Sequence, residues 1–183
     1  AYATTPNTTE FLDRPTGTGP FTGTSDVDDA QIHPGATSWD GRFVGFASDA
    51  DNLVPGQGNA FRNGFVRDTV AGTTELVNGG HPGSSVARVA LSADGRSALY
   101  VPDGSAYVRD LDADTEAIVS RADGPSGAVV VGTDPSELAL SGDGSRAAFV
   151  TSAALDAADT NGVNDVYARD LVTDDTTLAS RAA

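Results

Sequence analysis

Three stretches of this sequence match one another, and this repeat constrains the fold more than any other feature. Residues 38–46, 92–100 and 141–149 each begin with Ser-x-Asp-Gly and continue into small and apolar residues. An Asp-Gly pair between such segments is typical of a tight hairpin turn between two strands. Two further blocks follow each copy in the same order: residues 64–68, 106–110 and 166–170 end in Arg-Asp, and residues 73–78, 115–120 and 176–181 begin with Thr.

The spacing of the copies predicts the unit. The Asp-Gly turns stand at positions 40, 94 and 143, a period of roughly fifty residues, which is the size of a four-stranded propeller blade. We therefore expect an all-β segment over residues 1–183, with blades at residues 30–78, 86–121 and 135–181. Residues 8–13 resemble residues 73–78 and are expected to form the outer strand of a preceding blade. Insertions between the second and third strands are expected at residues 49–62 and 153–164.

The repeat resembles the TolB-like family of β-propellers, which is related to the WD-type propellers. The resemblance rests on the three Ser-x-Asp-Gly turns, on residues 52–56 leading to residues 65–68, and on residues 159–167 leading to residues 169–170. It covers about residues 8–181 and implies radial four-stranded blades. Such propellers serve as scaffolds, binding platforms and substrate gates, so the resemblance alone does not define an activity.

Three blades are too few for a closed ring, since propellers typically have about four to eight. We expect either that the chain is a fragment of a longer protein, or that two or more copies complete a ring. In the second case the protein is a homo-oligomer whose N-terminal strand pairs at the edge of a partner's blade.

Composition excludes several classes of function. The chain has 11 Lys+Arg against 26 Asp+Glu, a formal net charge of −15. Clustered cations are needed to bind nucleic acid, and anionic lipid would repel this chain. The absence of Cys excludes disulfides, thiolate catalysis and Cys-ligated zinc. No apolar run approaches the length of a membrane helix, so we expect no nucleic-acid partner and no membrane insertion.

One insertion carries a cluster of oxygen ligands. Asp159, Asn161 and Asp165 lie within seven positions of one another, and calcium favours such oxygen-rich loops. The late bidentate Glu of the calcium-loop pattern is missing. Asx turns that order the loop are the favoured alternative. Calcium is the single candidate cofactor, and no other is expected.

Two other residues are candidate ligand contacts. His33 precedes the expected innermost strand of the first blade, where it would face the central channel. Trp39, the only tryptophan, stands at the variable position of the first turn, as an exposed contact or packed over the turn. No nucleophile-elbow motif accompanies His33 or His81, so no catalytic residue is expected. The repeated Arg-Asp pairs are interpreted as structural, with Asp accepting from a turn and Arg capping a strand end.

These observations favour a non-catalytic binding or scaffold module that contacts a protein or glycan partner through its loops. The sequence opens with Ala1, Tyr2 and Ala3, which fits a mature chain after leader removal and equally an arbitrary boundary within a longer chain. With the resemblance to the TolB-like family, a secreted or periplasmic (cell-envelope) location is expected. One alternative is the gating propeller of a larger hydrolase, and another is a self-assembling structural unit.

Overall fold

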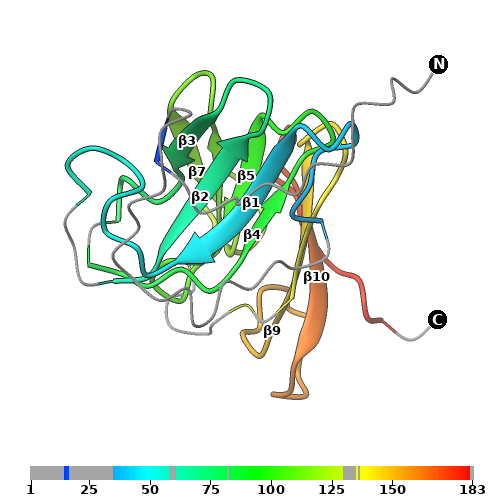
Figure 1. Cartoon of the computed structure of the whole chain (residues 1–183). Helices are drawn as coiled ribbons and strands as arrows, with labels where there is room; N and C mark the ends of the chain where they lie inside the picture. The colour runs from blue at the N-terminus through cyan, green and yellow to red at the C-terminus, as the bar shows by residue number, and fades with distance from the viewer. Residues whose placement is uncertain are drawn as a thin grey trace.

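The protein is built from three antiparallel sheets, as Figure 1 shows. The computed structural model describes residues 15–16, 35–57, 61–81, 83–129, 135 and 137–181. The first sheet, here the first blade, contains β1 (Phe43–Ser48), β2 (Asn63–Asp68) and β3 (Thr73–Leu76). The second blade contains β4 (Val89–Leu91), β5 (Ser97–Tyr100), β6 (Tyr107–Asp110) and β7 (Thr115–Ile118). The third contains β8 (Leu138–Leu140), β9 (Arg146–Thr151), β10 (Asp165–Asp170) and β11 (Thr176–Leu178).

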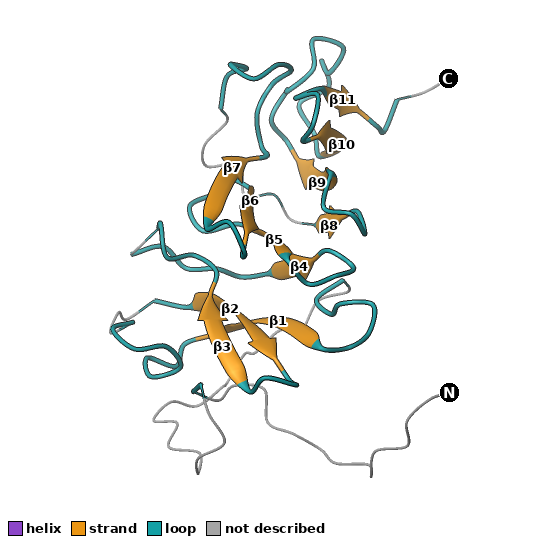
Figure 2. Cartoon of the chain, turned by 90° about the horizontal axis from the view of Figure 1, so that it is seen from above, coloured by secondary structure: helices purple, strands orange, loops and turns teal. Residues whose placement is uncertain are grey.

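Each sheet is a meander in which consecutive strands are neighbours. This order confirms the all-β fold of successive blades expected from the repeat. The insertions also lie where the sequence placed them, between β1 and β2 and between β9 and β10. Seen from above in Figure 2, the three blades follow one another in chain order. The described residues contain no helix that could span a membrane.

The first blade differs from the expected four strands. Among the described residues, its innermost segment pairs with β1 through the isolated bridge between Thr37 and Val44. The backbone hydrogen bonds on either side of this bridge run from Gly45 N to Ala36 O and from Ser38 N to Phe43 O. Gly35, with a φ of +85°, turns the chain out of the extended conformation just before this bridge. The expected outer strand at residues 8–13, and His33, lie outside the described residues.

Neighbouring blades pack face to face. We call the face of each sheet that points toward the next blade in chain order its leading face. On the first blade, Phe43 and Val66 of this face pack against Val89 and Tyr100 of the second. A Cβ added at Gly45 would lie 2.9 Å from Val89 Cγ1, so this glycine lets β1 and β4 approach closely.

The second interface uses the same faces of the next two blades. Leu99 and Val108 on the leading face of the second blade pack against Phe149 and Tyr167 of the third. The rings of Phe149 and Tyr167 stack with their centroids 6.1 Å apart. Burial of these side chains, each worth about 1.5–3 kcal/mol, joins the blades into one body.

Burial is not the same on the two faces of every blade. All six residues of β1 are buried, whereas β9 alternates between buried residues and residues that are half-buried or exposed. The small and apolar residues on both sides of residues 146–151 favour a strand buried on both faces, but only one face of β9 is buried. Among the described strands, none lies against the leading face of the third blade, since β10 and β11, which follow β9, belong to the same sheet.

Candidate functional site

The three Ser-x-Asp-Gly turns share one hydrogen-bond pattern. In the second blade, Ser92 Oγ donates to Asp94 Oδ1 (2.6 Å), which also accepts from Arg96 N (3.0 Å). Ser92 Oγ in turn accepts from Ser97 N (2.9 Å). These contacts, which recur in the other two turns, hold the pKa of the Asp94 carboxyl below its ordinary value, chiefly through the serine hydroxyl. Gly95 follows in the left-handed conformation, with a φ of +73°.

The variable residue of each turn links the blades to one another. Trp39 N donates to Ala93 O (2.7 Å), and Ala93 N donates to Gly142 O (2.9 Å). These hydrogen bonds join backbone groups, so they do not restrict which side chain stands at the variable position of the turn. Trp39 is 92% exposed, which excludes the interpretation that it packs over the turn. Its role as a ligand contact stays a prediction.

The repeated Arg-Asp pairs are structural. Asp68 accepts hydrogen bonds from Val70 N (2.9 Å) and Ala71 N (2.8 Å) in the following turn, as expected from the sequence. Its hydrogen bonds with the Arg42 guanidinium lower its pKa to about 2. The other half of the interpretation is wrong for two of the three arginines, which do not cap exposed strand ends. Arg67 and Arg169 are each 1% exposed.

The buried arginine of the third blade joins that blade to the connection before it. The Arg169 guanidinium donates to Thr176 Oγ1 (2.7 Å) and to Asp174 Oδ1 (2.7 Å). In the first blade, Arg67 donates in the same way to Thr74 Oγ1 (3.0 Å), and also to Pro15 O (3.3 Å). Pro15 therefore contacts the first blade through Arg67. Residues 121–124, which precede the third blade, contact that blade in the same way through Arg169 and Thr176.

The proposed calcium ligands lie together, but protein donors engage their oxygens. Asn161 Nδ2 donates to Asp165 Oδ2 (2.9 Å), and Asn161 N donates to Asp159 Oδ1 (3.4 Å). Tyr167 OH donates to Asp159 Oδ2 (2.5 Å), and Ser180 Oγ donates to Asp165 Oδ1 (2.5 Å). Burial and the Asp159 carboxylate raise the pKa of Tyr167 to about 12. This arrangement is the one expected of a loop ordered by its own side chains.

Within the described residues, no group of three or more His, Cys, Asp and Glu side chains is placed to hold a metal ion. The calcium hypothesis for Asp159, Asn161 and Asp165 stays a prediction.

A cluster that the sequence did not indicate surrounds His81. His81 Nε2 lies 2.8 Å from Glu116 Oε1, and its ring centroid lies 4.4 Å from that of Tyr107. The hydroxyl of buried Tyr100 donates to the second oxygen of Glu116, and burial raises the pKa of Tyr100 far above its ordinary value. No Ser or Thr hydroxyl of the described residues hydrogen-bonds to His81. The cluster ties the connection after the first blade to the second blade.

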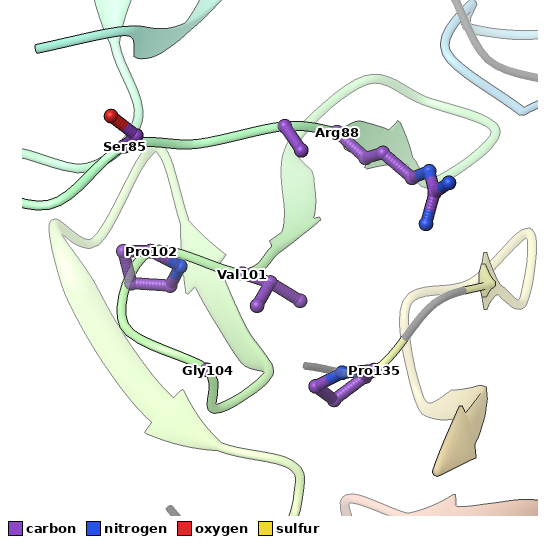
Figure 3. A pocket seen from close by; sticks show the side chains of 7 residues that line it. Ser85, Arg88, Val101, Pro102, Gly104 and Pro135 are labelled. Carbon is purple, nitrogen blue, oxygen red and sulfur yellow. The ribbon is translucent and has the colours of Figure 1, made fainter. Parts of the chain in front are cut away.

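A groove runs over the ends of the innermost segments, on the side of the long insertions. One part is a cavity of about 360 Å³ between the second and third blades. The other part, of about 320 Å³, lies beside the ion pair between Asp49 and Arg62. Ser85 and Ala87 line both parts, so we treat them as one groove. Figure 3 shows the part nearer the third blade, which is lined by Ser85, Ala87, Arg88, Val101, Pro102, Gly104 and Pro135.

Arg88 is the charged residue of this part of the groove. It directly precedes β4, and its Nε is buried without a hydrogen-bond partner. A single arginine before a short apolar strand carries no motif, so the sequence did not indicate Arg88 as a site residue. The groove is assembled from segments about fifty residues apart, so only the packing of the blades reveals it.

Solved structures share the arrangement of blades. The tricorn protease superposes with a TM-score of 0.51 at 13% identity, over 79% of this chain and 12% of that one. An oligogalacturonate lyase from Vibrio parahaemolyticus superposes with a TM-score of 0.51 at 14% identity, over 80% of this chain and 38% of that one. This likeness supports the propeller-type fold. The chain thus spans well under half the length of each of these proteins. No protein-family model and no curated protein matches it.

Proposed function

We propose that the chain is a non-catalytic binding or scaffold module of a secreted or envelope-associated TolB-like propeller. The groove around Ser85 and Ala87 is the observation that carries the proposal, because concave sites where structural units meet are where ligands bind. Its partner is a protein or a glycan. With a net charge of −15, nucleic acid is disfavoured as a partner.

A matched pair of variants tests the groove as the binding site. Ala87→Trp fills the groove from an exposed position, whereas Ala113→Trp adds the same bulk at an exposed position in the turn between β6 and β7. The probes are a displayed library of random peptides and a panel of neutral and acidic oligosaccharides. We expect ligands selected on the unmodified protein to lose binding to Ala87→Trp and to retain it on Ala113→Trp. Equal binding to both variants would refute the groove as the site.

The gating propeller of a larger hydrolase is the alternative. The comparison with a protease, of which the chain covers only 12%, favours this second proposal. In such a protein the propeller admits substrate while another domain does the chemistry. A Gly-x-Ser-x-Gly segment in the sequence adjoining this chain would support it, and a flanking sequence that encodes only further blades would count against it.

The leading face of the third blade favours self-assembly or a further blade. Val66 and Val108, which occupy one position of the repeat, are 4% and 8% exposed under the next blade. Ala106 is fully buried, yet its equivalent in the third blade, Val166, is 39% exposed. We therefore propose that another blade-like face covers this surface, supplied by a longer chain or by a second copy.

A further inference from the structure

Arg88 is half-buried in a molecule where carboxylates are abundant, yet it pairs with no carboxylate of the described residues. No hydrogen bond or ion pair joins it to any other described residue, and its Nε is shielded from solvent. By contrast, six other arginines form ion pairs: Arg42, Arg62, Arg96, Arg109, Arg146 and Arg169. The Nε atoms of Arg109 and Arg169 also lack a partner, but each of these guanidinium groups holds a carboxylate through another nitrogen. A half-buried guanidinium with no acceptor at all is destabilising. The position therefore suits an acceptor that comes from a ligand.

The walls beside Arg88 are apolar. Val101, Pro102 and Pro135 contribute hydrocarbon surface, and Gly104 leaves the wall without a side chain, as Figure 3 shows. The prolines have no backbone N–H to donate. The volume of about 360 Å³ is within the range of ligand pockets. A small apolar group beside the guanidinium fits this lining.

The third feature is the backbone that leads to Arg88. Val86 is buried and its N donates to Arg62 O (2.8 Å), while Ser85 and Ala87 are exposed along the groove. Within the described residues, the backbone groups of Ser85 and Ala87 have no hydrogen-bond partner. An extended segment of this kind offers its free N–H and C=O groups to a peptide in strand conformation.

We propose that this part of the groove binds the C-terminal carboxylate of a peptide, which specifies the ligand of the binding function proposed above and rests on it. The Arg88 guanidinium takes the carboxylate in a charge-assisted contact. The last side chain, an apolar one, lies against Val101, Pro102 and Pro135. The peptide main chain runs along Ser85 and Ala87. An acidic sugar also carries a carboxylate, but on the side of Val101, Pro102 and Pro135 its hydroxyls would lie against side chains that offer no polar partner.

Titration calorimetry with two tripeptides tests the proposal. The probes are N-acetyl-Ala-Ala-Leu as the free acid and as the C-terminal amide. We expect the free acid to bind and the amide to bind at least tenfold more weakly. Arg88→Gln should weaken binding of the acid by about ten- to hundredfold and remove the difference between acid and amide. The control is Arg146→Gln, a highly exposed arginine outside the groove, which should change neither value.

Three results would overturn the carboxylate site: no binding of the acid, equal binding of acid and amide, or unchanged binding of the acid to a folded Arg88→Gln variant. Binding of trigalacturonate that depends on Arg88, without binding of the peptide, would overturn the peptide assignment. The proposed function fails separately, when ligands selected from the library are insensitive to Ala87→Trp. If library ligands lose binding to Ala87→Trp but bind Arg88→Gln unchanged, the result supports the binding module and refutes the carboxylate site.

Discussion

Two glycines at the same position of the repeat should respond very differently to substitution by alanine. Gly41 and Gly95 both follow the Asp of a Ser-x-Asp-Gly turn, with φ of +71° and +73°. A Cβ added at Gly41 meets no described atom within 4 Å. A Cβ added at Gly95 would lie 2.5 Å from the Cβ and Cγ of Phe43, on the preceding blade.

The magnitudes follow from these contacts. A left-handed conformation costs an L-residue about 1–2 kcal/mol, and both variants bear this term. Gly95→Ala adds overpacking of about 1–3 kcal/mol. Phe43 has little freedom to yield, because the contact involves its Cβ and the residue is 8% exposed. In a chain of this size each kcal/mol corresponds to roughly 2–4 °C in Tm.

Urea unfolding followed by circular dichroism measures the difference, with Gly41→Ala as the matched control. We expect Gly95→Ala to lose about 1–3 kcal/mol more than Gly41→Ala. In a Phe43→Ala background this excess should disappear, because the obstructing ring is removed. Equal losses at the two glycines, or an excess that persists without the ring, would refute the packing of Phe43 into the second blade.

Four further predictions concern charge, exposure and assembly. Arg42 lowers the pKa of Asp68 to about 2 from 3.8. The ionised Asp68 carboxylate therefore stabilises the folded protein above about pH 4, and this stabilisation is lost as the pH falls from about 4 to 2. Urea midpoints measured from pH 6 to 2 should therefore fall less steeply for Asp68→Asn than for the unmodified protein. Trp39→Ala should change the free energy of unfolding by no more than about 0.5 kcal/mol, because the side chain is exposed. Weaker binding of a library ligand to this variant would support the role of Trp39 as a contact. If calcium binds at Asp159, a chelator should lower Tm; an unchanged Tm discards the site. If a second copy covers the third blade, light scattering should give a multimer that Val166→Asp dissociates, and a well-folded monomer at all concentrations counts against it.

The sequence by itself determined the repeat unit and the order of its strands. Each Ser-x-Asp-Gly turn is local: the serine, aspartate and glycine bond to one another and to the next few residues, so three short motifs located three hairpins. The insertions followed from counting residues between these turns and the Arg-Asp pairs. The turns can be predicted from the sequence alone because their hydrogen bonds join residues that are no more than five positions apart.

Only the tertiary structure decided what each blade presents to its neighbour. Val66 and Val166 both read as apolar strand residues, but one lies under a blade and the other is exposed. Arg88 and Arg169 each follow an alanine in the sequence. Arg88 lies in the groove without a hydrogen-bond partner among the described residues, whereas Arg169 is buried and donates to Thr176 and Asp174. Burial and the groove depend on residues about fifty positions away, brought together when the sheets stack. No pattern within one repeat contains that information.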